Sequence, residues 1–290
     1  MSSTLVPESQ APRLFDESNL AVVYCGEETE YRRKKGGLFL IEQLVLSVTS
    51  LRQNWSATVP VCFMHTGPLA TSTLDALDHL GVESQRHERF DERYPISNKM
   101  LVGYYKGSRH VLFMDCDTIV HRPVRIPNPA RAALLVAPDV MPSLDEATFR
   151  DVFDRIGAPA LKGKFVHSPA LAYYAHDRTD LFPNWNAGVY VVERGTLDKL
   201  LVSYLHYLGK LIEAFGDKEW AFFIDQLCFT AAALTVASPI AFLPKGVNFI
   251  CTPRSDVLSW WPKSAVVVEH YAGDTSSPSL NFSDLSWPRR

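Results

Sequence analysis

The amino-acid sequence predicts an α/β protein whose central sheet is mostly parallel and flanked by helices, and three observations support this fold class. Short apolar runs without polar interruption, typical of strands buried on both faces, recur along the chain. Between several of them, apolar residues repeat at helical spacing. With 290 residues, 47% of them hydrophobic, the chain can bury a full core as one large α/β domain or two smaller ones.

In the first third of the chain, strands and helices alternate at lengths that produce parallel strands with right-handed connections. The expected elements are strands over 21–25, 59–64 and 82–86 and helices over 38–51 and 74–80. A further helix is expected to open near Ser97, because serine is a common helix cap. It leads into the central apolar strand at 111–114, which is expected to lie inside a parallel sheet.

The second half of the chain resumes this pattern after a long excursion. The expected elements are strands over 132–137, 185–192 and 265–273 and helices over 196–215 and from 224 onward. Residues 140–183 depart from the alternation and hold a helix over 144–156, and such an insertion at the carboxyl end of a sheet is typically a lid or a substrate-contacting loop. The predicted organisation is a flexible tail at 1–19, one folded domain at 20–273 and a second tail at 274–290.

Composition excludes several classes of partner. A formal net charge of −3 gives no global attraction to nucleic acid or to an anionic membrane. No apolar signal-peptide core occurs near the start, and the most apolar later window, 227–243, is too short and too interrupted to span a bilayer. The five cysteines are odd in number and widely spaced, which favours reduced thiols and a cytoplasmic location.

Two carboxylates follow the central strand. Asp115 and Asp117 are two positions apart, so both can face the crevice beyond the carboxyl end of the strand, where open α/β sheets bind ligands. Two close carboxylates repel one another unless a metal ion, a proton or a cationic side chain lies between them, and the pair suits a hard divalent cation. Aspartate is also an ordinary turn residue after a strand, so the pair alone leaves the turn and metal-site interpretations open.

Five short motifs then occur in a familiar order. They are the apolar strand with Asp115-Cys116-Asp117, then Ala137-Pro138-Asp139, Asn186-Ala187-Gly188-Val189, Asp225-Gln226 and His270-Tyr271-Ala272-Gly273. Together they resemble the GT-A glycosyltransferases, most of all family 8, the retaining group that includes glycogenin and bacterial lipopolysaccharide galactosyltransferases. The resemblance covers most of 21–273 outside the insertion, and it implies a GT-A catalytic domain. The insertion is expected to be an acceptor lid because of its place in the chain, with a surface decoration as the alternative.

The resemblance implies a retaining hexosyltransferase that moves a sugar from a nucleotide diphosphate sugar to a hydroxyl acceptor. A UDP-sugar is the favoured donor, and the acceptor is a glycan, a lipid-linked molecule or a small molecule. By likeness of position, Asp115, Asp117 and His270 would bind Mn²⁺ or Mg²⁺. The resemblance places Tyr31, Lys99, Asp115, Asp139, Asn186, Gly188 and Gly273 against the donor, and Asp225 and Gln226 beneath its anomeric carbon.

These residue types suit the implied chemistry. A divalent cation stabilises the negative charge on the leaving diphosphate. A carboxylate or amide oxygen stabilises the oxocarbenium-like sugar. Covalent attack by Asp225 or Gln226 and front-face entry of the acceptor would both give retention. The sequence leaves the acceptor and the oligomeric state open, a homo-oligomer included.

The chain departs from the family at one point, and two other functions fit parts of its sequence. The family commonly continues His-Phe-x-Gly-x-x-Lys-Pro-Trp, whereas the chain continues from Gly273 without the phosphate-binding lysine, so Lys245 or Arg254 would have to replace it. The stretch 115–119 also fits the Asp-x-Asp-x-Thr opening of haloacid dehalogenase phosphatases, although no later Gly-Asp-x-x-x-Asp site follows. A sugar-nucleotide-binding protein with decayed catalysis is the other alternative.

Overall fold

A computed structural model of the chain describes residues 17–27, 40–92, 94–126, 132–140, 144–216, 224–237, 239–251 and 261–271. The predicted donor-binding residues Tyr31 and Gly273, Arg254 and most of the two predicted tails lie outside these ranges. No helix of the described segments combines the length and the apolar character that a membrane crossing requires.

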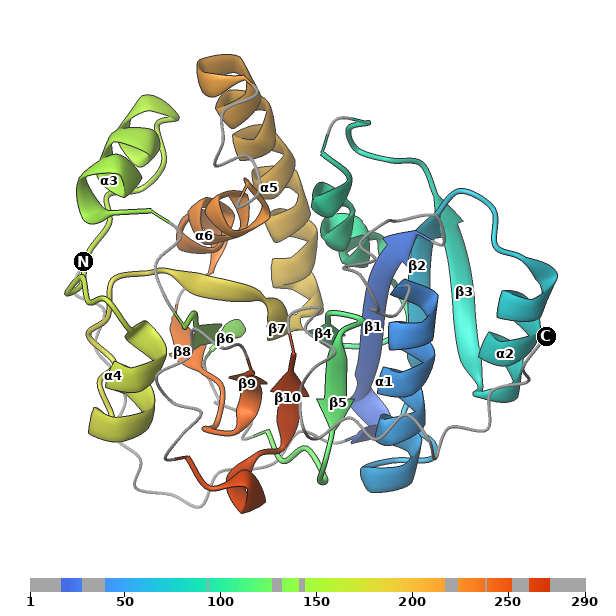
Figure 1. Ribbon diagram of the computed structural model, residues 1–290. Helices are drawn as coiled ribbons and strands as arrows, with labels where there is room; N and C mark the ends of the chain where they lie inside the picture. Colours follow the sequence, from blue (N-terminus) through green and yellow to red (C-terminus); the bar gives the residue numbers. More distant parts are fainter. Residues whose placement is uncertain are drawn as a thin grey trace, which may run out of the picture.

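A seven-stranded sheet forms the centre of the molecule (Figure 1). Its strands, in spatial order, are β3 (Val82–His87), β2 (Val61–Thr66), β1 (Leu20–Glu27), β4 (His110–Met114), β7 (Trp185–Glu193), β6 (Leu134–Pro138) and β8 (Ile240–Phe242). Neighbouring strands run parallel, except that β7 is antiparallel to both β4 and β6. The mostly parallel sheet predicted from the sequence is confirmed, while β4 has one antiparallel neighbour where two parallel ones were expected.

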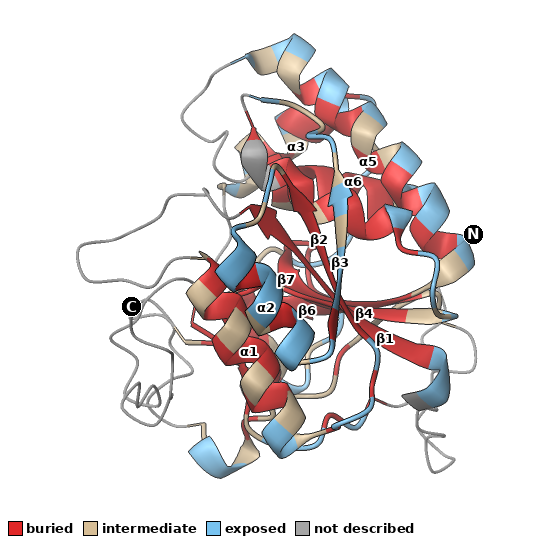
Figure 2. Cartoon of the chain, turned by 90° about the vertical axis from the view of Figure 1, so that its right-hand side faces the viewer, coloured by how far each residue is buried: buried red, intermediate tan, exposed pale blue. Residues whose placement is uncertain are grey.

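Helices cover both faces of this sheet (Figure 2). One face is covered by α1 (Leu40–Asn54) and α2 (Thr71–His79), and the other by α5 (Arg194–Phe215) and α6 (Ile224–Val236). Successive side chains of a strand point to opposite faces, so Val111 and Phe113 of β4 join the core beneath α5 and α6, whereas Leu112 joins the core beneath α1. Both faces are buried, which explains the uninterrupted apolar runs of the central strands.

A smaller three-stranded sheet packs beside the carboxyl end of β4. Its strands are β5 (Thr118–Val120), β10 (Val268–His270) and β9 (Val247–Ile250), with β10 in the middle. Because β10 pairs with β5 in antiparallel register, His270 lies opposite Thr118, one residue after the second aspartate of the pair. Within the described residues, the strand predicted over 265–273 is only three residues long and belongs to this second sheet, and β5, β8 and β9 were not predicted.

The segment before β4 differs from its prediction. Residues Pro95–Tyr104 form a 3₁₀ helix, η2, and Ser97 lies inside its first turn, where its hydroxyl donates to the carbonyl of Tyr94 at 2.7 Å. Ser97 is thus not a helix cap, because Pro95 already supplies the first helical position. Short 3₁₀ helices η1 (Glu17–Asn19) and η4 (Lys263–Ala265) precede β1 and β10.

The insertion folds into two helices. The predicted helix over 144–156 is present as α3 (Glu146–Arg155), whose amide at Thr148 is capped by the Asp145 carboxylate. A second helix, α4 (Pro169–His176), was not predicted. It begins beside the end of β6, because the Ala170 amide donates to the Asp139 carbonyl at 3.0 Å. The insertion is therefore joined to the carboxyl edge of the main sheet.

Candidate active site

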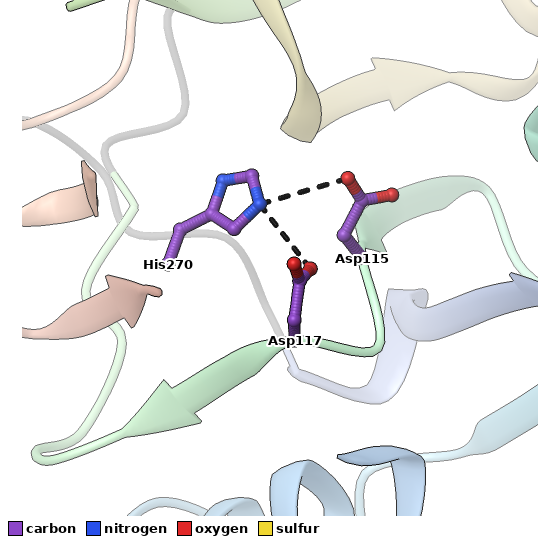
Figure 3. Close-up of side chains that lie close together, drawn as sticks. All are labelled: Asp115, Asp117 and His270. Carbon is purple, nitrogen blue, oxygen red and sulfur yellow. Dashed lines mark ion pairs between the residues drawn. The ribbon is translucent and has the colours of Figure 1, made fainter. Parts of the chain in front are cut away.

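Three ligand atoms from distant parts of the sequence meet at the carboxyl end of β4 (Figure 3). Asp115 follows β4, Asp117 precedes β5, and His270 closes β10. The His270 Nε2 atom lies 3.2 Å from Asp117 Oδ1 and 3.7 Å from Asp115 Oδ2. One ligand atom from each residue lies within 4.8 Å of the other two. The small sheet brings these residues together, because the Tyr271 amide also donates to the Asp117 carbonyl at 3.1 Å.

These atoms fit a divalent cation. Two carboxylate oxygens and one imidazole nitrogen are a set of ligand atoms that can bind Mn²⁺ or Mg²⁺. At metal–ligand bonds of about 2.0–2.2 Å, opposite ligands are about 4.4 Å apart, so only small shifts would let all three share one ion.

The electrostatics of Asp115, Asp117 and His270, which together form the triad, also favour a positive charge among them. Burial raises the pKa of Asp115 above its ordinary value, against the lowering effect of the Lys99 ammonium. Burial opposes ionisation of Asp117 too, but the neighbouring His270 holds the pKa of this carboxyl below its ordinary value. The pKa of His270 is raised, because Asp117 and Asp115 outweigh the effect of its burial. A cation among these groups would relieve the repulsion between the carboxylates.

Gly188 provides the room in which the triad assembles. The antiparallel pairing of β7 with β4 sets its first half beside the end of β4, and the Asp115 amide donates to the Gly188 carbonyl at 2.7 Å. A methyl group at Gly188 would overlap Cε1 of His270 and would lie only 2.8 Å from Asp115 Oδ2. Any larger residue would therefore displace the triad.

Lys99 connects the triad to Asp225. Its Nζ atom lies 2.7 Å from Asp115 Oδ2 and 3.2 Å from Asp225 Oδ2. Burial would lower the pKa of Lys99, but the two carboxylates raise it above its ordinary value, so the side chain is a permanent cation. Asp225 lies in the first turn of α6 and is buried. The charge of this aspartate is thus compensated beside the triad.

A second group of predicted residues surrounds the carboxyl of Asp139. Burial raises the pKa of its carboxyl to about 6, against hydrogen bonds from the Val140 amide and from the Gln226 and Asn186 side chains. Asn186 lies near Asp139 because Ala137 of β6 pairs with Asn186 of β7. Asp139, Asn186 and Gln226 therefore form one hydrogen-bonded group.

Contacts join every predicted site residue that the structure describes. Lys99, Asp115, Asp117, Asp139, Asn186, Gly188, Asp225, Gln226 and His270 belong to this network. The proposed substitute for the missing lysine is engaged elsewhere, since Lys245 Nζ donates to the Tyr174 carbonyl at 3.0 Å and pairs with Asp177.

One residue that was not predicted from the sequence joins the two groups. Asn248 in β9 contacts both His270 Nδ1, at 3.1 Å, and Asn186 Oδ1, at 3.0 Å. Its only signal in the sequence is a lone amide inside the apolar run 247–250.

Comparison with solved structures identifies the fold class. An active-site variant of LgtC matches 87% of this chain and 87% of its own at 12% sequence identity, with a TM-score of 0.55. The galactosyltransferase LgtC in complex with donor and acceptor sugar analogues matches at 13% identity, covering 88% and 87%, with a TM-score of 0.50. The bifunctional glycosyltransferase WbbM matches 94% of this chain and 48% of its own at 12% identity and 0.50. The chain thus has the GT-A glycosyltransferase fold.

Comparison of the sequence narrows this class to a family. Residues 37–236 match the family described as the Rhodobacterales glycosyltransferase domain, and the chain belongs to that family. The resemblance to GT-A glycosyltransferases drawn from the five motifs is confirmed, and the phosphatase alternative is set aside. No curated protein matched the sequence significantly.

Proposed function

We propose that this glycosyltransferase transfers a hexose, with retention of configuration, from a nucleotide diphosphate sugar to a hydroxyl acceptor. A UDP-sugar is the favoured donor, and Mn²⁺ or Mg²⁺ is the cofactor. The observation that carries the proposal is the convergence of Asp115, Asp117 and His270 on one point beside Asp225. Two carboxylates and one imidazole are suitable ligands for a cation that in turn binds a diphosphate.

The residues of the site divide the task between the two ends of the donor. Asp115, Asp117 and His270 would hold a cation, which would supply Lewis-acid charge to the departing diphosphate. Lys99 adds a second positive charge, which lies between the carboxyl groups of Asp115 and Asp225. Asp225 and Gln226 are proposed to stabilise the oxocarbenium-like sugar from below, and retention is compatible with both a covalent and a front-face route.

Asp139, Asn186 and Gly188 are proposed to hold the donor sugar, with Tyr31 and Gly273 contacting the donor on the basis of the resemblance. The burial of Asp139 and its bonds to Asn186 and Gln226 support this role, since buried and fully bonded groups keep a fixed geometry. The acceptor side is proposed to lie in the insertion 140–183, because α4 begins beside Asp139. Residues 20–273 would then form one catalytic domain.

A thermal-shift screen of nucleotide sugars with and without Mn²⁺ tests the donor and the cofactor together, because a ligand of the folded state raises the melting temperature with its occupancy. Asp117→Asn should abolish Mn²⁺-dependent donor binding in calorimetry and leave the fold intact. Asp198→Asn, at an exposed position of α5, is the matched control and should bind normally. Unchanged donor affinity in Asp117→Asn would rule out the metal role.

A hydrolysis assay distinguishes an active enzyme from a protein with decayed catalysis. Incubation of the best donor with Mn²⁺ and no acceptor should release the sugar slowly by hydrolysis, because water replaces the acceptor hydroxyl. Donor binding without any turnover would support a binding protein.

A further inference from the structure

Asn248 occupies an unusual backbone position. Its φ angle is +63°, in the left-handed region that residues other than glycine rarely adopt, although asparagine enters it more readily than most. The pairing of β9 with β10 shifts at this point, since Val268 lies opposite Val247 whereas Glu269 lies opposite Phe249. Asn248 is the extra residue of this bulge, and bulges re-aim side chains next to sites. Its amide is buried.

The N–H group of Gly188 determines which atom donates in each hydrogen bond that Asn248 makes with Asn186 and His270. The Gly188 N–H can only donate, so the atom of Asn186 that it reaches at 2.9 Å is an oxygen. The same oxygen lies 3.0 Å from Asn248, which must therefore present its NH₂ group there. The other atom of the Asn248 amide, an oxygen, then faces His270 Nδ1 at 3.1 Å.

This direction determines which nitrogen of His270 is left for a ligand. Since an amide oxygen accepts only, the Nδ1 atom of His270 carries a hydrogen and donates it to Asn248. The Nε2 atom then points at Asp117 and Asp115, as a cation site requires. Histidines that bind metal commonly donate their other N–H to such a partner, which fixes both the tautomer and the ring orientation.

Through Asn186, these hydrogen bonds continue to Asp139, which belongs to the proposed sugar-binding residues. The Asn186 oxygen is occupied by Gly188 and Asn248, so the NH₂ group of Asn186 is left for the Asp139 carboxylate, which also bonds Gln226. One amide therefore links the imidazole of the triad to the side chains around Asp139.

We propose that Asn248 is a positioning residue that holds His270 for cation binding with its oxygen and Asn186 for donor binding with its NH₂ group. The inference rests on the proposed metal and donor roles of those two residues. It assigns Asn248 no contact with the reacting atoms.

Two substitutions separate the two halves of this role. Asn248→Gly keeps the left-handed backbone without strain and removes both hydrogen bonds. Asn248→Asp keeps an oxygen for His270 Nδ1 but turns a second acceptor toward the Asn186 oxygen, so that only the Asn186 contact is lost. Asn19→Asp, at an exposed position before β1, is the control for the added charge.

Calorimetry with Mn²⁺ alone, and then with a UDP-sugar in the presence of Mn²⁺, measures both contacts. Asn248→Gly should weaken Mn²⁺ binding by about 10- to 100-fold, the usual effect of losing a partner of a metal-binding histidine. Asn248→Asp should bind Mn²⁺ at least as well as the wild type but bind the donor at least about tenfold more weakly. Nitrogen NMR of the Mg²⁺-loaded proteins should show a His270 Nδ1 hydrogen that exchanges slowly with water in the wild type and in Asn248→Asp and faster in Asn248→Gly, because only the first two offer it an oxygen.

Wild-type Mn²⁺ affinity in a folded Asn248→Gly protein would overturn the inference while leaving the proposed function intact. Equal loss of Mn²⁺ affinity in the two variants would also overturn it, because it would show that the oxygen contact to His270 is not what matters. A wild-type protein that binds no Mn²⁺ would refute the metal role itself and this inference with it.

Discussion

Replacement of Gly188 by alanine should disable the cation site through a single methyl group. That methyl would overlap Cε1 of His270 and lie 2.8 Å from both Asp115 Oδ2 and Asn186 Oδ1, whereas ordinary contacts begin near 3.4 Å. The two oxygens would have to move by about 0.6 Å, and the imidazole further. Metal sites tolerate deviations of only about 0.2 Å in their ligand distances. The variant should therefore bind Mn²⁺ at least about tenfold more weakly, a cost of about 1.4 kcal/mol.

Titration calorimetry with Mn²⁺ and urea unfolding of the metal-free proteins together test this reasoning. The added methyl should also lower the free energy of unfolding by about 1–3 kcal/mol, as overpacking commonly does. Gly209→Ala is the matched control, since a methyl at that position of α5 meets no atom within 4 Å. It should bind Mn²⁺ normally and gain about 0.5–1 kcal/mol of stability from the better helix former. Normal Mn²⁺ binding by folded Gly188→Ala would show that Gly188 does not limit the geometry of the triad.

Three further substitutions probe the rest of the site. Lys99→Met leaves Asp115 and Asp225 without their counter-charge and should lower the metal-free free energy of unfolding by about 3 kcal/mol in urea titration, while a loss under about 1 kcal/mol would contradict the pairing. The pKa of Asp139 is raised to about 6, so the folded state binds this proton more tightly than the unfolded state does, and the protonated carboxyl's contribution to the free energy of unfolding is lost as pH rises from about 4 to 6. The melting temperature of Asp139→Asn relative to the wild type should therefore rise over that pH interval. A constant difference between the two melting temperatures would refute the shift. Gln226→Ala should lower kcat far more than donor affinity, and equal losses in steady-state kinetics and calorimetry would argue against a transition-state role.

Sequence patterns predicted the parts of this molecule that depend on local chemistry. The apolar runs of β1, β2 and β4 reflect burial on both faces, and the carboxylates at 115 and 117 stand where such a strand ends. The three-stranded sheet could not be predicted from the sequence, because β5 and β10 have three residues each and no periodicity that distinguishes them from loops. The position of His270 was carried over from a family resemblance and not from any local pattern.

Asn248 shows the limit of such reasoning most clearly. Its importance comes from a left-handed backbone, a shift in strand register and two side chains that lie far from it in the sequence. None of these leaves a mark in the residues around position 248 beyond one amide in an apolar run. The error at Ser97 has a similar origin, because the same residue type caps one helix and lies buried inside another, depending on where the preceding proline begins the turn.

Anomalous diffraction from crystals grown with Mn²⁺ and UDP tests the central claim most directly, since it locates the ion independently of any activity. We predict one strong peak about 2.2 Å from a carboxylate oxygen of Asp115, a carboxylate oxygen of Asp117 and Nε2 of His270, next to the diphosphate of the bound UDP. Bound UDP without an anomalous peak at these three residues, or a peak elsewhere in the molecule, would contradict the account.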